Sequence, residues 1–233
     1  MKVSVWRGDA LGSLQTFEVP RFPSQTVLDV VTHIQRHLDP TLAYRYACRV
    51  GMCGSCAMTV NGQPRWTCRT HVDRVAKNET LEVRPLRNLP VIRDLVTDMR
   101  TFFDKWQRAG GHFDGRSTKA DDFARIAPES AERKSIDAGI ECIGCGVCYA
   151  ACDVVKWNPD YLGPAALNRA WTLVADSRDT DSARLRAVAG DAGCHACHTH
   201  MSCTERCPKH ISPTAGIAGL KRAVAKAEID GKL

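Results

Sequence analysis

Long apolar runs are missing from this 233-residue chain, and aromatic residues make up only 6% of it. No stretch reaches the roughly 20 uncharged apolar residues that a membrane-spanning helix needs, so we expect any membrane association to depend on a partner. Residues 1–7 run into a polar, strand-like pattern without the apolar core of a secretory signal, which predicts that the chain stays inside the cell. The net charge of +6 is modest and its Lys and Arg residues are scattered, so nucleic acid is not an expected partner.

Cysteine, in contrast, is abundant, with 12 residues in the chain. Between residues 142 and 152 four of them follow the spacing C-x2-C-x2-C-x3-C, which holds iron-sulfur cubes in bacterial ferredoxins. A second run, residues 197–208, ends in Cys-Pro like such a motif but has His200 at the position of its second Cys. Structural zinc or disulfides are the alternatives, although zinc sites favour paired C-x2-C knuckles separated by a longer loop.

These two runs predict two neighbouring clusters, because the fourth Cys of each run in two-cluster ferredoxins binds the other cluster. The first set should hold a [4Fe-4S] cluster and consists of Cys142, Cys145, Cys148 and Cys207. The second set has only three thiols, which is the number that a [3Fe-4S] cluster needs: Cys152, Cys197 and Cys203.

A further group of cysteines lies earlier in the chain at the plant-type [2Fe-2S] spacing, C-x4-C-x2-C with a distant fourth Cys. Gly51 and Gly54 allow this loop to curl around a cluster and to turn backbone N–H groups toward its sulfurs. The predicted [2Fe-2S] ligands are Cys48, Cys53, Cys56 and Cys68.

Short strand-like runs separated by turn signals surround this loop. Residues 2–7 and 14–19 form one predicted hairpin, and residues 57–60 and 63–66 form another around an Asn-Gly turn. Residues 80–85 are the last predicted strand. Together with one helix, these elements predict a β-grasp ferredoxin.

That helix is predicted over residues 25–38. Its His33 and His37 are spaced i, i+4, but no third metal ligand is nearby, which favours a solvated helix face. The residues expected on its buried face are Val27, Val30, Val31, Ile34 and Leu38.

The remainder of the chain has helical patterns. The first is predicted over residues 90–106. Later helices are predicted over residues 164–176, 181–189 and 214–227. The fold class is therefore α+β, with a β-grasp [2Fe-2S] domain over residues 1–100 and an α-helical two-cluster ferredoxin domain of the bacterial type over residues 101–233.

The two ferredoxin types in this order resemble the iron-sulfur subunit of succinate dehydrogenase and fumarate reductase, the complex II family. The likeness covers nearly the whole chain, and the segments that carry it are residues 48–56, 90–95, 142–152, 157–160, 176–179 and 197–209. It implies an electron-transfer subunit of a succinate:quinone oxidoreductase, without catalysis by the chain alone. It also implies a flavoprotein partner with FAD and membrane anchor subunits, with or without haem b. The subunit would then lie peripherally on the cytoplasmic face of the bacterial inner membrane.

The resemblance also suggests residues for the quinone end. Trp157 matches the Trp that lines the quinone pocket in similar proteins, and His198 follows Cys197 as the corresponding His does. The alternatives are core packing for Trp157 and surface hydrogen bonding for His198. Asp153 and His200 depart from the pattern of the best-known bacterial members, and both are near the three-iron cysteines in sequence.

One cysteine is left over. Cys194 begins a Cys-His-Ala-Cys-His sequence that superficially matches c-type haem attachment, but Cys197 is already assigned and no export signal is present. A buried or spare thiol is the expected role of Cys194.

Two other functions compete with the complex II role. One is the electron-transfer part of a soluble thiol-dependent fumarate reductase, which typically fuses further Cys-rich domains, whereas this chain ends at Leu233 without one. The other is a stand-alone ferredoxin carrier, which is usually small and acidic, whereas this chain is long and basic.

Overall fold

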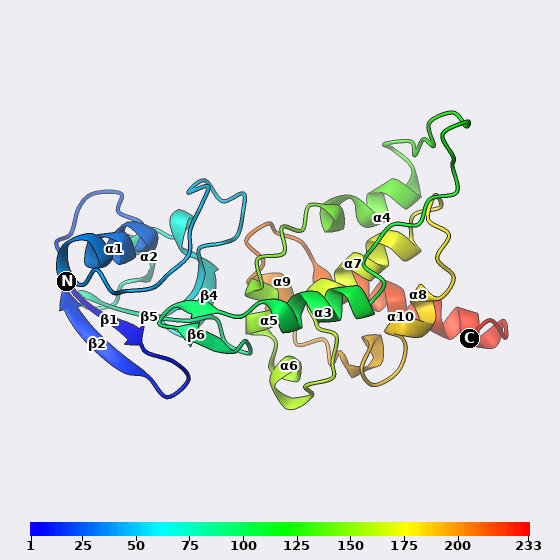
Figure 1. Cartoon of the computed structure of the whole chain (residues 1–233). Coiled ribbons are helices and arrows are strands. Elements are labelled where there is room, and N and C mark those ends of the chain that lie inside the picture. Colours follow the sequence, from blue (N-terminus) through cyan, green and yellow to red (C-terminus); the bar gives the residue numbers. More distant parts are fainter. The chain divides into compact units, whose positions relative to one another are not determined.

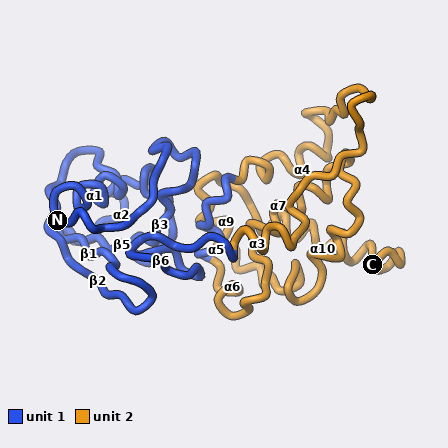
Figure 2. The backbone as a smooth tube through the Cα atoms, in the orientation of Figure 1, with its two compact units in different colours: residues 1–101, 143–151 blue, residues 102–142, 152–233 orange.

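A computed structural model describes residues 1–233, which separate into two compact units (Figure 2). Unit 1 consists of residues 1–101 and 143–151, and unit 2 consists of residues 102–142 and 152–233. The division predicted at residue 100 differs from this one chiefly in the segment 143–151. That segment lies in unit 1 because its helix α5 (Val147–Ala151) contacts strand β4 (Gln63–Trp66).

Unit 1 is built on a five-stranded sheet in the order β2-β1-β5-β3-β4 (Figure 1). Strand β1 (Lys2–Arg7) pairs antiparallel with β2 (Ser13–Glu18) and parallel with β5 (Thr80–Arg84). Strand β3 (Ala57–Val60) pairs antiparallel with both β4 and β5. The five predicted strands are confirmed to within one residue at either end. Together with the helices of unit 2, they confirm the α+β class.

Helix α1 (Val27–His33) starts at a capping box in which the Thr26 hydroxyl accepts the Asp29 N–H and the Asp29 carboxylate accepts the Thr26 N–H. Its apolar face packs into the core of the sheet as predicted. The chain continues as a π-helix, η1 (Ile34–Leu38), in which Asp39 N–H bonds Ile34 O at 2.8 Å. Leu38 is 45% exposed, so its predicted burial is wrong. The wider π turn carries Leu38 away from the buried face.

The helix predicted over residues 90–106 is wrong in its first half. Residues there form a short hairpin, β6 (Val91–Arg93) and β7 (Val96–Thr97), and only then does helix α3 (Arg100–Arg108) begin. The helical pattern of the sequence is overridden in this stretch by tertiary contacts.

Asp94 makes those contacts from the turn of the hairpin. Its side chain is 2% exposed and its backbone is left-handed, with φ +50°. One carboxylate oxygen accepts the Gly8 N–H at 2.7 Å, and the other accepts the Ala43 N–H at 2.8 Å. A continuous helix would give up both bonds and leave a buried carboxylate short of donors, which is costly.

Unit 2 is helical, and its long helices pack against one another: α7 (Pro164–Val174) contacts both α4 (Ala131–Ile140) and α10 (Pro213–Ile229). A Cβ on Gly219 of α10 would lie 2.7 Å from the Trp171 ring of α7, so glycine permits this close packing. The shorter helices of the chain are η2 (Thr67–Arg69), α2 (Val72–Val75), α6 (Asp153–Trp157), α8 (Arg184–Val188), η3 (Cys194–Ala196) and α9 (Ser202–Glu205). None of the helices has the length and apolar character to span a bilayer.

Candidate functional site

The first candidate site is the loop between η1 and β3, where three of the predicted [2Fe-2S] thiols lie. The Met52 and Cys53 N–H groups point at Cys48 Sγ at 3.2 and 3.3 Å. The Cys68 N–H, in η2, points at Cys56 Sγ at 3.5 Å. All these thiols are free of disulfides. Sulfurs surrounded by backbone donors fit a cluster whose charge those donors stabilise.

Two glycines shape this loop as the sequence predicted. Gly51 and Gly54 have φ values of +76° and +71°, which side chains rarely adopt. A Cβ on Gly51 would lie 3.1 Å from the Trp66 ring and 3.1 Å from the Arg69 side chain. A Cβ on Gly54 would lie 2.5 Å from the Cβ of Cys145, in the cube motif. The two motifs therefore meet within unit 1 with no room for a side chain at position 54.

The predicted [2Fe-2S] thiols differ in their environment. Hydrogen bonds from the Cys48 backbone and from Ser55 lower the pKa of Cys53 to about 6. Burial and the neighbouring Cys56 thiol raise the pKa of Cys68 to about 12. Cys53 therefore becomes a thiolate, the form that ligates iron, more readily than Cys68 does.

The cube motif is divided between the two units. Cys145 and Cys148 belong to unit 1, where Gly146 has φ +77° and Cys148 is buried in α5. Cys142 and Cys207 belong to unit 2. The fourfold ligand set derived from spacing stays a prediction.

The three thiols predicted for a [3Fe-4S] cluster, Cys152, Cys197 and Cys203, line one cavity in unit 2. They come from three places in the chain: the N-terminus of α6, the end of η3 and the middle of α9. Burial raises the pKa of Cys152, and its two neighbouring thiols raise it further. Three sulfurs brought from such distant segments into one cavity fit a cluster that needs three thiolates.

Two hydroxyl-bearing residues lie beside these sulfurs, and the sequence had not indicated them. The backbone N–H groups of Val155 and Val154 act against burial and lower the pKa of Cys152. The buried Tyr161 lines the same cavity as Cys197. Thr214 Oγ1 lies 3.4 Å from Cys203 Sγ. The only sequence signal for Tyr161 was its place directly after the family-like residues 157–160.

The two residues proposed for quinone occupy different positions beside this cavity. His198 lines it, whereas Trp157 does not and is 66% exposed, which rules out core packing. His200, also in the lining, stands near both rings. Its ring centroid lies 6.3 Å from that of Trp157, edge-on, and 6.1 Å from that of His198. Trp157, His200 and His198 thus form a row of three rings, which we call the aromatic edge. The sequence had not indicated His200 as a member of this row.

The remaining candidates stand apart from the thiol sites. Cys194 is fully buried in η3 and does not line the cavity, and burial raises its pKa. The His33 and His37 rings lie 4.7 Å apart on unit 1. No group of three or more His, Cys, Asp or Glu side chains is gathered closely enough to hold a single metal ion.

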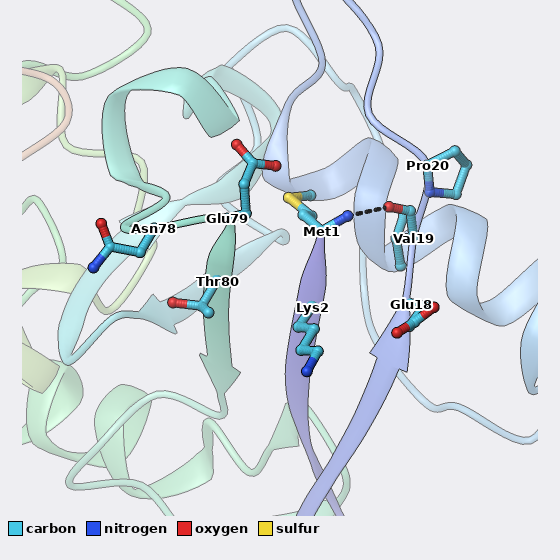
Figure 3. A pocket seen from close by; sticks show the side chains of 8 residues that line it. All are labelled: Met1, Lys2, Glu18, Val19, Pro20, Asn78, Glu79 and Thr80. Atoms are coloured by element: carbon cyan, nitrogen blue, oxygen red, sulfur yellow. Dashed lines mark hydrogen bonds between the residues drawn. The ribbon is translucent and has the colours of Figure 1, made fainter.

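A separate hollow lies where β1 and β5 begin and β2 ends (Figure 3). The Met1 ammonium donates there to Val19 O at 2.9 Å. The hollow also has the Lys2 ammonium and the carboxylates of Glu18 and Glu79 on its wall, but no thiol. It therefore has none of the ligands that an iron-sulfur cluster uses.

Known proteins resemble this chain over nearly its whole length. A model for a 2Fe-2S iron-sulfur cluster binding domain matches residues 2–104, and one for a 4Fe-4S dicluster domain matches residues 139–211. A fumarate reductase iron-sulfur subunit of Mycobacterium tuberculosis (strain CDC 1551 / Oshkosh) is 36% identical over 97% of this chain and 92% of its own length. One of Haemophilus influenzae is 34% identical over 88% of this chain and 83% of its own length.

A solved structure shows the same likeness in three dimensions. A chain of the Mycobacterium smegmatis Sdh1 complex in the apo form matches with a TM-score of 0.88 and 31% identity. The match covers 98% of the chain described above and 96% of the Mycobacterium smegmatis chain.

Proposed function

This chain belongs to the family of iron-sulfur subunits of fumarate reductase and succinate dehydrogenase, and we propose that it conducts electrons between FAD in a flavoprotein partner and quinone at a membrane anchor. Electron transfer follows from the family and from the 2Fe-2S and 4Fe-4S binding domains. The chain is one subunit of an oxidoreductase, and the succinate and fumarate chemistry belongs to the flavoprotein.

Three ligand sets are part of this proposal. When bound, the clusters supply carriers that take up one electron at a time, which suits a path between a two-electron flavin and quinone. The [2Fe-2S] ligands are Cys48, Cys53, Cys56 and Cys68. The [4Fe-4S] ligands are Cys142, Cys145, Cys148 and Cys207, and the [3Fe-4S] ligands are Cys152, Cys197 and Cys203.

The observation that carries the proposal is the meeting of two cluster motifs within unit 1. Gly54 of the [2Fe-2S] loop lies against the Cβ and Cα of Cys145, closer than any side chain would allow. Cys152 follows the cube segment directly in the chain and lines the cavity of the three-thiol set. In the proposed series, electrons pass from the [2Fe-2S] set through the cube set to the three-thiol set.

The exit toward quinone is proposed at the aromatic edge formed by Trp157, His198 and His200. An exposed indole N–H can donate to a quinone carbonyl, and an imidazole can donate or relay the proton that accompanies electrons onto the ring. We place this edge toward the membrane anchor, with the complex on the cytoplasmic face of the bacterial inner membrane.

Variants in the assembled complex test this exit. Trp157→Leu and His198→Ala should lower succinate:quinone turnover, while succinate still reduces the clusters at near-parent rates. His37→Ala, which removes an exposed imidazole from unit 1, is the matched control and should retain full turnover. If both test variants keep full turnover and unchanged sensitivity to quinone-site inhibitors, the exit lies elsewhere.

Purification from native membranes tests the partners. The chain should come with a flavoprotein and with membrane subunits, and the chain by itself should show no succinate-dependent activity. Activity of the purified chain free of flavoprotein would overturn the proposal. Isolation with a soluble thiol-dependent partner, or with none, would instead indicate one of the two competing functions.

A further inference from the structure

Two side-chain hydroxyls line the three-cysteine cavity together with its thiols. Thr214 Oγ1 lies 3.4 Å from Cys203 Sγ. The phenol of Tyr161 belongs to the same lining as Cys197. We infer that Tyr161 and Thr214 are positioning residues that raise the reduction potential of the cluster held by this cavity, an inference that rests on the proposed function.

Tyr161 is held firmly in place. Its side chain is among the most completely buried of the chain, with 1% of the residue exposed, and it lines the cavity with the three thiols. Its N–H bonds Asn158 O at 3.1 Å, and the next residue, Leu162, bonds Ala192 O at 2.8 Å. A buried phenol needs a partner for its hydroxyl. Tyr161 lines the same cavity as Cys197, so the Cys197 sulfur is the partner assigned to it in this inference. Because a cluster-bound thiolate can only accept, the phenol must be the donor.

The hydroxyl of Thr204 orients the hydroxyl of Thr214 toward Cys203. The Thr204 hydroxyl donates to Thr214 Oγ1 at 2.9 Å, and the Thr214 N–H donates to Thr204 Oγ1 at 3.4 Å. Since Thr214 Oγ1 already accepts from Thr204, its own proton is free to point at Cys203 Sγ, 3.4 Å away. The start of α10 thus holds one hydroxyl in a fixed orientation toward the sulfur.

The effect on the cluster follows from charge. A reduced cluster has one more negative charge than an oxidised one, and donors to its sulfurs stabilise that charge, more strongly in a buried cavity than in water. Both hydroxyls therefore favour reduction. The loss of either should lower the equilibrium constant for one-electron reduction about tenfold, which corresponds to about 59 mV. The cluster beside the aromatic edge would then attract electrons from the preceding clusters less strongly.

Two variants remove a hydroxyl with little change of shape. Tyr161→Phe keeps the ring and Thr214→Val keeps the branched side chain. In the assembled complex, a redox titration followed by electron paramagnetic resonance should show the oxidised three-iron signal titrating about 59 mV lower in each variant. Thr214→Ser, which retains a hydroxyl, should restore the parent potential. Tyr44→Phe is the control, because it removes a phenol that bonds Thr32 in unit 1 and should leave this potential unchanged.

The possible failures are distinguishable. A three-iron signal that is present in both variants at the parent potential would overturn this inference and leave the proposed function intact. A parent complex without any oxidised three-iron signal would overturn the ligand assignment of the proposed function itself. If Thr214→Val loses the cluster altogether, Tyr161→Phe still decides, and a parent-like potential there would count against the inference.

Discussion

Replacement of Arg184 by Met should destabilise unit 2 strongly. The Arg184 side chain is 1% exposed and pairs with Asp179, whose side chain is 2% exposed. Its Nε donates to Gly110 O and its Nη2 donates to His112 O, both at 2.8 Å. The guanidinium thus joins α8 to the segment that follows α3, and no solvent is available to replace it.

The magnitude follows from what the substitution leaves behind. Arg184→Met keeps an unbranched stem of similar length but leaves a buried carboxylate without its cation and two carbonyls without a donor. Breaking a buried ion pair in this way costs about 3 to 5 kcal/mol. For a unit of this size, that loss should lower the melting temperature on the order of 10 °C. Heating the assembled protein while recording far-ultraviolet circular dichroism and the visible iron-sulfur absorbance would measure it.

Two further variants make the test specific. Adding Asp179→Asn to Arg184→Met should recover part of the loss, since a buried amide without a partner costs less than a buried charge. Arg21→Met is the matched control, because Arg21 also pairs with two carboxylates, Asp73 and Glu79, but these are 61% and 65% exposed. Its melting temperature should hardly change. A loss in Arg184→Met no larger than that in Arg21→Met would refute the reasoning.

The other predictions concern the cluster sites. Gly54→Ala should disturb the [2Fe-2S] and cube signals in electron paramagnetic resonance. Gly62 has a similar positive φ but nothing within 4 Å of an added Cβ, so Gly62→Ala should leave both signals intact. Equal damage in the two variants would mean that backbone strain is the cause. His200→Cys supplies the missing cube thiol, so the oxidised three-iron signal should decline toward [4Fe-4S], and an undiminished signal would count against the motif. Cys194→Ser should leave iron content and spectra unchanged while Cys203→Ser loses the three-iron signal, and loss of a cluster in the Cys194 variant would show that the thiols are paired differently.

The β-grasp sheet could be predicted from the sequence because its signals are local. Each hairpin reverses at turn residues that tolerate a left-handed backbone, such as Asn61 and Gly62, with φ +47° and +76°. The family relationship was predictable for the same reason, since cysteine spacing within short segments indicates the type of cluster. Even the convergence of Cys152, Cys197 and Cys203 in one cavity followed from the spacing of two such motifs.

The donors around that cavity could not be predicted. Tyr161 and Thr214 belong to no spacing pattern with the cysteines of the cavity that they line. Whether their hydroxyls face a sulfur depends on how the loop after α6 and the start of α10 pack against η3 and α9. His200 was noticed as a missing thiol, but only the fold shows its ring near both Trp157 and His198.

By itself, then, the sequence determined the cluster motifs, the strands and the family, because each depends on residues close together in the chain. Tertiary contacts decided where the local preferences of the sequence are overridden. Residues 91–97 form a hairpin instead of a helix because Asp94 bonds Gly8 and Ala43, 86 and 51 positions away. Segment 143–151 lies in unit 1 because α5 contacts β4. A buried polar group that lacks a hydrogen-bond partner is costly. That cost outweighs differences in helix propensity, which are about a few tenths of a kcal/mol per residue.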